Sequence, residues 1–237
     1  MAALADESGR RVVVAADVGT ADQHQIAVSN LLDFIADWQP DEVRILTDAA
    51  CDIGRDSCDA THCPDMTPEP EALTSALRDL RRRYSGPVNL RTPGALAIAT
   101  GDCLPCCGLP VKALRSLDVS CRIEATRQGR PWQSAYLNVC HIQSGYAGQV
   151  ALGLARLLDQ PTIVGGTGRM GIASNHNGTD KSSALWGMEV GTMRTLEPGQ
   201  TADRRTTGFA LINGSTPHMV PADARGAFTA LGRYYGS

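Results

Sequence analysis

Apolar residues recur with two different periods along this chain and predict an alternation of strands and helices. The runs "RVVVAADVG" and "EVRILTD" are short and rich in β-branched residues, as buried strands are. Between them, apolar residues recur every three or four positions over residues 24–38, which predicts an amphipathic helix that ends before Pro40. This order predicts a right-handed βαβ unit with parallel strands.

The same patterns predict further elements along the chain. A second helix begins near Pro70, where Leu73, Leu77 and Leu80 share one face, and "GPVNL" follows it as a third strand. The remaining predictions are strands at "VSCRIEA", "SAYLNVCHI" and "PTIVGG", a helix at "GYAGQVALGLARLLD", a glycine-rich loop at residues 164–178, and antiparallel strands at "SALWGMEVGTM" and "TGFALING". The segment "DARGAFTALGRYYG" is expected to form a closing helix with Asp223 as its cap.

Composition and charge are those of an ordinary globular protein. Hydrophobic residues make up 43% of the chain, charged residues 20%, and the net charge of -3 gives no reason to expect nucleic acid or an acidic membrane as partner. The sequence contains no apolar run of about 18 residues that would predict a membrane span, and no export signal. We expect a flexible tail over residues 1–10, one domain over residues 11–237, and a cytoplasmic or virion-associated location.

Polar or glycine-rich loops follow the predicted strands, and their order resembles that of the calcineurin-like metallophosphoesterases, especially the phage and actinobacterial members. In that family an Asp follows the first strand, a Gly-Asp pair the second, a Gly-Asn-His-Asp motif the third, a His a later strand, and a Gly-His-Thr-His-Arg loop the next. Asp17, Asp48 and His141 match the first metal ligand, the bridging Asp and the later His. The resemblance extends from about Arg11 to Gly236 and implies an α/β fold, a β-sandwich of two mixed sheets flanked by helices.

The chain departs from the family pattern at several other ligand positions. Gly166 and Gly168 stand where the family has two histidines, and Gly19 stands where a His or Gln is frequent. The loop "NLRTPGALA" after the third strand contains no Asn-His pair. The family mechanism needs two metal ions about 3.5–4 Å apart, each held by several ligands. Because glycine has no side-chain donor, the resemblance implies a degenerate metal site.

Two functions remain open at this point. The first is a catalytically degenerate binding or structural protein of phage origin, which has no cofactor and binds a protein partner or a second copy of itself. The alternative is a metal-dependent phosphoesterase with an altered centre, in which Asp17, Asp48 and His141 hold a single ion such as manganese or zinc. The two aspartates can equally cap turns, and His141 can be a hydrogen-bonded structural residue.

The cysteines add a second candidate centre. Seven of the eight fall in or near loops on the edge where the family binds its metals: Cys51, Cys58, Cys63, Cys103, Cys106, Cys107 and Cys140. The pairs Cys58/Cys63 and Cys103/Cys106 have the short spacing of thiolate ligands for zinc or an iron–sulfur cluster. Disulfides that close the long loops, or small buried thiols, are the other interpretations.

Overall fold

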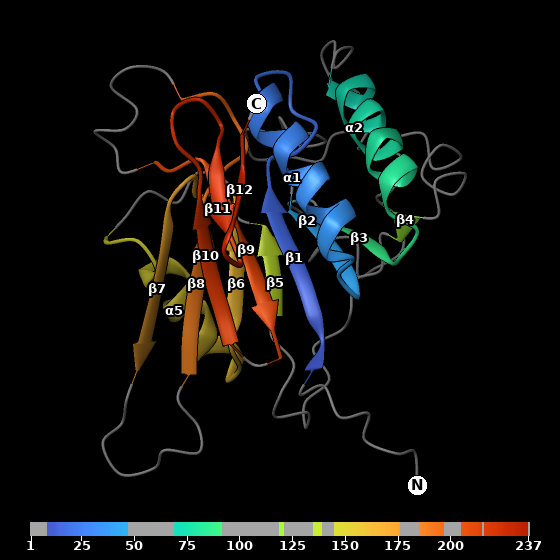
Figure 1. The fold of residues 1–237 in the computed structure, drawn as a ribbon. Helices are drawn as coiled ribbons and strands as arrows, with labels where there is room; N and C mark the ends of the chain where they lie inside the picture. The colour runs from blue at the N-terminus through green and yellow to red at the C-terminus, as the bar shows by residue number, and fades with distance from the viewer. Residues whose placement is uncertain are drawn as a thin grey trace, which may run out of the picture.

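Two β-sheets packed face to face form the centre of the molecule (Figure 1). The computed structural model describes residues 9–46, 69–91, 119–120, 135–138, 145–175, 185–196, 205–214 and 216–236. Within these residues the first sheet has the strand order β10 (Thr216–Pro221), β9 (Gly208–Asn213), β1 (Arg11–Ala16), β2 (Glu42–Leu46), β3 (Val88–Arg91), β4 (Val119–Ser120). The second has the order β5 (Ala135–Asn138), β6 (Thr162–Gly165), β8 (Leu185–Val190), β7 (Met170–Asn175).

Both sheets are mixed, as the sequence predicts. Strands β1 to β4 are parallel to one another, whereas β9 is antiparallel to both β1 and β10. In the second sheet β5, β6 and β8 are parallel and β7 is antiparallel to β8. The order of β1, helix and β2 confirms the predicted βαβ connection between parallel strands.

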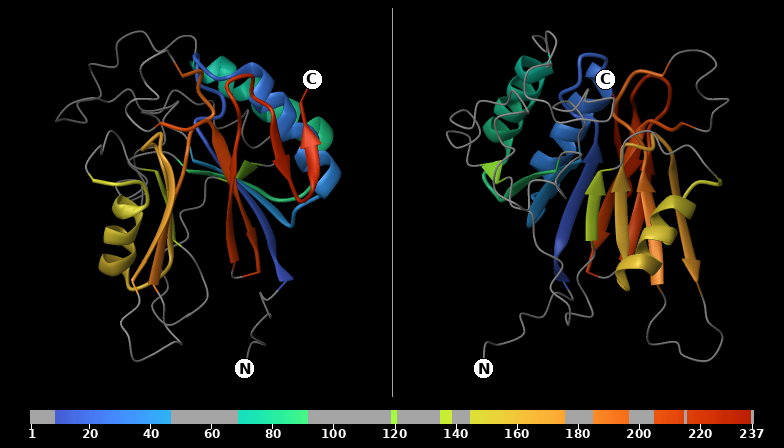
Figure 2. Two further views of the ribbon diagram at one scale, coloured as in Figure 1. Left: turned by 60° about the vertical axis from the view of Figure 1, so that its left-hand side comes forward. Right: turned by 180° about the vertical axis from the view of Figure 1, so that it is seen from behind.

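Helices cover the outer faces of the two sheets (Figure 2). The first sheet is covered by α1 (Gln25–Trp38) and α2 (Glu69–Arg83), and the second by α5 (Gln149–Leu158). Gly187 of β8 allows α5 to pack closely, since a Cβ there would lie 2.1 Å from the backbone nitrogen of Leu152. None of the described helices is long and apolar enough to span a membrane.

The alternation of side chains along β1 divides the core into two layers. Val13 and Ala15 pack under the helices with Phe34, Leu77 and other apolar residues. The intervening residues of β1 face the second sheet and pack against apolar residues such as Ile163 and Met188. Strand β1 is therefore buried on both faces, which fixes the position of the residues that follow it.

The predicted closing helix at the C-terminus is wrong. Residues 223–236 contain instead a hairpin of β11 (Phe228–Ala230) and β12 (Arg233–Tyr235). Its two-residue turn has positive φ at both positions, 49° at Leu231 and 79° at Gly232, a conformation that no right-handed helix contains. The aromatic rings of Phe228 and Tyr235 stack at 5.3 Å and pack against Phe34, so burial of aromatic surface outweighs the helical periodicity.

Other predictions need smaller corrections. The expected loop at residues 164–178 contains all of β7, and only residues 166–169 of its described part form the turn between strands. Strands β8 and β9 both exist, but they lie in different sheets, and each is antiparallel to a different neighbour. Of the predicted strand "VSCRIEA" only β4 lies within the described residues, and of "SAYLNVCHI" only β5.

Candidate functional site at the carboxyl edge of the sheets

The carboxyl ends of six strands meet at one edge of the sandwich. Strands β1, β2 and β3 are parallel, and so are β5, β6 and β8. The two sets are joined at this end because the N–H of Met193, three residues after β8, donates to the carbonyl of Ala16 at the end of β1. We call this end the carboxyl edge; it is where α/β folds place their sites.

Asp17 is the residue that follows β1 at this edge. Its amide donates to the carbonyl of Leu46 at 2.8 Å, which extends the pairing of β1 with β2 by one residue. The backbone then turns with φ of 60°, a value that aspartate tolerates better than most residues. Only 3% of Asp17 is exposed. The fold thus buries this carboxylate at the edge of the core.

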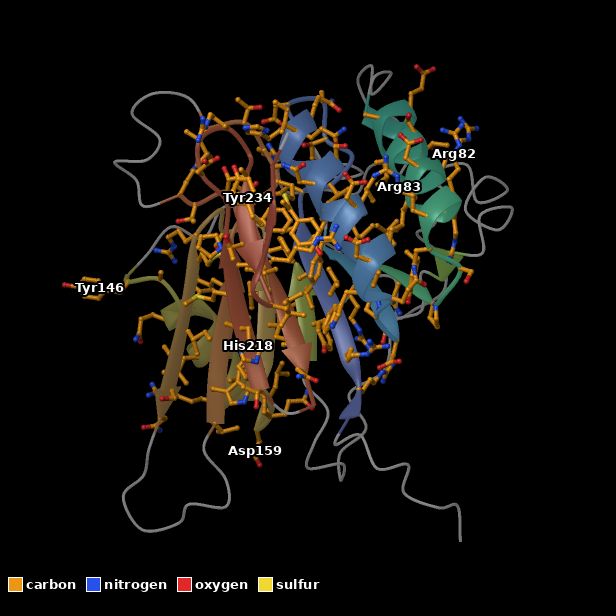
Figure 3. All side chains as sticks on the ribbon, in the orientation of Figure 1. Arg82, Arg83, Tyr146, Asp159, His218 and Tyr234 are labelled. Carbon is orange, nitrogen blue, oxygen red and sulfur yellow. The ribbon has the colours of Figure 1, made fainter. Side chains whose placement is uncertain are left out.

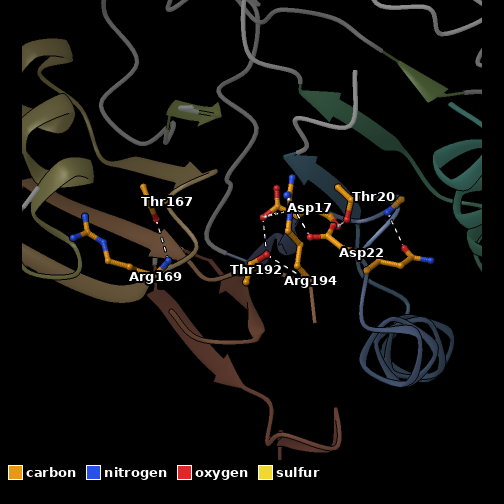
Figure 4. Close-up of polar contacts among 9 residues, drawn as sticks. Asp17, Thr20, Asp22, Thr167, Arg169, Thr192 and Arg194 are labelled. Carbon is orange, nitrogen blue, oxygen red and sulfur yellow. Dashed lines mark hydrogen bonds and ion pairs between the residues drawn. The ribbon is translucent and has the colours of Figure 1, made fainter. Parts of the chain in front are cut away.

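The Asp17 carboxylate is bound by residues from the other sheet (Figure 4). The hydroxyl of Thr192 donates to Oδ2 of Asp17 at 2.7 Å. The Arg194 guanidinium lies near the same oxygen, with Nε at 3.8 Å, and its Nη1 lies 3.5 Å from Oδ2 of Asp22. This arrangement places one cation between two carboxylates and satisfies the buried Oδ2 with a short hydrogen bond.

Thr192 and Arg194 belong to a short segment, residues 191–195, that crosses from one sheet to the other. At its start the amide of Gly191 donates to Arg169 in the turn after β6. Further on, Met193 bonds with Ala16 and also accepts from the amide of His24 at 2.7 Å. Thr195 donates to Asp22. This crossing segment therefore joins the end of β1, the start of α1 and the turn after β6.

The turn after β6 is the second part of the edge. Gly166 and Gly168, the positions at which the resemblance expects histidine, have φ of 82° and 67°. The side chain of Arg205 covers Gly168, because a Cβ there would lie 3.4 Å from its Cγ and Cδ. The amide of Thr206 donates to the Gly168 carbonyl at 2.9 Å. The turn is thus held by a backbone hydrogen bond from Thr206 and covered by the side chain of Arg205.

A buried ion pair fixes this turn to α5. Nε of Arg169 lies 3.1 Å from Oε2 of Glu189, a side chain that is completely buried on β8. The other oxygen of Glu189 accepts from the amides of Gly148 and Val150 at the start of α5, which has no side-chain cap of its own. Arg169 also donates to the carbonyl of Gly145 at 2.8 Å. Glu189 therefore supplies the missing helix cap from the sheet.

The described residues at this edge do not fit a two-metal centre. Gly166 and Gly168 have no side-chain donor, and the Arg194 cation lies beside Asp17, the one predicted ligand that is described. Among the described residues, no group of three or more His, Cys, Asp or Glu side chains is placed to hold a metal ion. The other candidates lie outside the described residues: Asp48, His141, Cys51, Cys58, Cys63, Cys103, Cys106, Cys107 and Cys140.

Sequence reasoning missed the residues that bind Asp17 and the turn after β6. Thr192 contacts Asp17 across a separation of 175 residues, for which no local pattern exists. Glu189 had a usable signal, because it is an acid within the otherwise uncharged strand "LWGMEV" and the predicted helix "GQVALG" begins without a capping residue. The two features together favour a contact between Glu189 and the start of this helix.

Comparison with known proteins supports the fold. No protein-family model matches the chain, and no curated protein is significantly similar to it in sequence. The structure of an archaeal phosphodiesterase aligns over 89% of this chain and 99% of its own length, with a TM-score of 0.50 and 9% identity. Two structures of Vps29 from Entamoeba histolytica, a single-residue variant and the wild type complexed with zinc, align over 94% of this chain and 95% of theirs, with TM-scores of 0.41 and 14% identity. The metallophosphoesterase-like fold expected from the sequence is confirmed, and at this level of identity the likeness concerns the fold alone.

Proposed function

We propose that this chain is a member of the metallophosphoesterase superfamily that does not perform two-metal phosphoester hydrolysis and acts as a binding or structural component. One observation carries the proposal. The buried carboxylate of Asp17, which matches the first metal ligand of the enzymes, is used to hold the crossing segment through Thr192 and Arg194.

The electrostatics at Asp17 argue against a divalent cation there. Thr192 donates to Oδ2, so one lone pair of the oxygen that faces Arg194 is already used in a hydrogen bond. The Arg194 guanidinium lies 3.8 Å from this oxygen and would repel the incoming ion. Two unit charges about 4 Å apart near a protein surface interact by about 4 kcal/mol, and a divalent ion doubles the charge. Arg194 therefore supplies the positive charge beside the Asp17 carboxylate that a metal ion would otherwise supply.

The turn after β6 supports the same conclusion. Its two glycines have left-handed backbone conformations, which for other L-residues cost about 1–2 kcal/mol each. The turn is held in place by the buried pair of Arg169 and Glu189. A turn that is braced by an ion pair does not depend on metal coordination for its shape.

We propose that the chain binds a protein partner or a second copy of itself through exposed aromatic side chains. Tyr146 before α5 and Tyr234 in the C-terminal hairpin are 70% and 61% exposed, and Tyr146 extends away from the ribbon (Figure 3). Tyrosine is enriched at protein interfaces because its ring supplies apolar area and its hydroxyl a hydrogen bond.

Metal analysis and a phosphodiesterase assay test the proposal. We expect protein purified without chelators to hold no stoichiometric metal, and to hydrolyse bis(p-nitrophenyl) phosphate with added manganese no faster than an Asp17→Asn variant. Stoichiometric metal, together with turnover that Asp17→Asn and Asp48→Asn both abolish, would overturn the proposal in favour of a hydrolase with an altered centre.

A further inference from the structure

We propose that the outer face of α5 is a dimer interface, at which this helix packs antiparallel against α5 of a second copy of the chain. The inference rests on the proposed binding or structural function, for which it names a surface and a partner. Within the described residues α5 packs mainly against β6, β7 and β8, and its opposite side faces away from the second sheet (Figure 2). The interface does not include Asp17.

The outer face of α5 is apolar, unlike that of an ordinary surface helix. Residues three and four positions apart share one side of a helix. The side of α5 that faces away from the sheet carries four residues without a polar side-chain atom: Val150, Gly153, Leu154 and Leu157. Leu157 is 79% exposed, and Arg156, on one flank, is the only charged residue of the helix. A helix that is apolar on both sides is typically covered on both sides.

Gly153 lies in the middle of this face and indicates that the covering element is a helix. A Cβ at this position would meet no atom within 4 Å, so the glycine does not reflect close packing within the chain itself. Glycine in an exposed helix costs about 1 kcal/mol of stability relative to alanine. A second helix offsets this cost, because a glycine lets another backbone approach closely and leaves a hole for a neighbouring side chain.

The face is complementary to itself when the two helices run antiparallel. A twofold axis between positions 153 and 154 sets Leu154 of each copy over Gly153 of the other. The same axis sets Val150 of each copy opposite Leu157 of the other. Each large side chain thus meets a smaller one, and both copies contribute the same residues, as a closed twofold dimer requires.

The ends of α5 are also complementary in charge. The first turn of α5 contains no acidic residue, and the N-terminus of a helix attracts negative charge. The exposed Asp159 follows the last turn (Figure 3). The antiparallel arrangement therefore places the Asp159 carboxylate of each copy beside the first turn of α5 in the other copy. The two helix dipoles also oppose each other, which is the favourable arrangement.

The size of the face predicts a weak, reversible dimer. Stable interfaces bury about 1,200–2,000 Å² in total. A helix of 10 residues is only about 15 Å long, so one such helix from each copy buries less than this. Tyr146, which lies one turn before α5 and is 70% exposed, adds aromatic area at the end of the pair. We therefore expect a dissociation constant on the order of 10–100 μM.

Sedimentation equilibrium of the full chain with reductant, from about 5 to about 500 μM, tests the dimer. Wild type should change from monomer to dimer within this range. Leu157→Glu should raise the dissociation constant by about 100-fold, because the dimer loses two buried leucines and gains two buried charges. Leu231→Glu is the matched control, because Leu231 is also exposed, at 60%, but lies in the turn of the C-terminal hairpin. It should dimerise like wild type.

A pair of variants tests the antiparallel register. Val150→Lys and Leu157→Glu should each prevent association alone, and an equimolar mixture of the two should form a heterodimer, because the antiparallel arrangement brings the new charges together. Gly153→Leu fills the central hole and should weaken the dimer by about tenfold or more. Melting temperatures at about 5 μM, where the chain is monomeric, show that each variant still folds.

Three results would each overturn the proposal: a wild-type chain that stays monomeric, a dimer that survives Leu157→Glu, or a mixture of folded variants that does not associate. Binding of a different protein or of lipid vesicles to this face of a monomeric chain would overturn it as well. None of these results involves metal, so the proposed function would stand. Metal-dependent turnover would overturn the proposed function and leave the sedimentation result unchanged.

Discussion

The turns after β1 and after β6 reach the same edge of the sandwich, yet only the turn after β1 keeps a ligand residue that the resemblance expects. The turn after β1 carries the expected carboxylate, that of Asp17, which accepts a hydrogen bond from Thr192 and lies beside the Arg194 guanidinium. The turn after β6 follows the expected backbone route, but Gly166 and Gly168 offer no side-chain ligand. The identity of Asp17 shows that a metal ligand is available at this position. Its contacts with Thr192 and Arg194 show what the carboxylate binds in this structure.

The two turns also differ in how they are held. Among the contacts of Asp17 are the short hydrogen bond from Thr192 and a longer ion pair with the partly exposed Arg194. The turn after β6 is held by Arg169 and Glu189, which are both almost completely buried. A buried ion pair is costly to break because the remaining charge has no partner, so the turn without ligands should be the more sensitive to substitution.

The largest expected effect comes from Arg169→Met. This change leaves the buried Glu189 carboxylate with its two amide donors but without its cation, and should lower the free energy of unfolding by about 3–5 kcal/mol. Urea denaturation measures the loss. The matched control is Arg82→Met, because Arg82 lies on the outer surface of α2 (Figure 3). This change removes an exposed pair with Asp79 and should cost less than about 1 kcal/mol. Equal losses for the two variants would refute the bracing role of Arg169.

A smaller effect is expected from Gly168→His, which restores a side chain at a degenerate position. The left-handed backbone and the Arg205 side chain over this residue should lower the free energy of unfolding by about 1–2 kcal/mol. Gly153→His is the control, because Gly153 lies in α5 with ordinary backbone angles and a Cβ there would meet no atom within 4 Å, so the change should cost almost nothing. Gly168→His without loss of stability would mean that the turn readily accepts a ligand.

The sequence predicts the elements whose periodicity reflects burial. The β-branched runs of β1 and β2 are buried as expected, since both strands are covered on both faces. The apolar face of α1 is also buried, since the helix packs on one clear face. The pattern predicts a helix at the C-terminal hairpin because Phe228, Leu231 and Tyr235 also have helical spacing, whereas the positive φ of the intervening turn depends on tertiary packing.

The candidate site is less accessible to prediction than the fold. Asp17 was identified because it follows a strand directly, and Glu189 could have been found from a charged position within an apolar strand. The contacts of Thr192 and Arg194 with Asp17 could not, because they join residues that are far apart in sequence and depend on how the two sheets pack. Those long-range contacts decide how the Asp17 carboxylate is used.

Thermal unfolding with and without metal tests most directly whether Asp17 has a structural role. The melting temperature of the wild-type chain in 1 mM manganese should equal that in EDTA within about 1 °C, and Asp17→Asn should lower both values equally. An ion bound at about 100 times its dissociation constant would add about 2.7 kcal/mol, or about 5–10 °C for a chain of this size. A rise of that magnitude that Asp17→Asn removes would contradict the account.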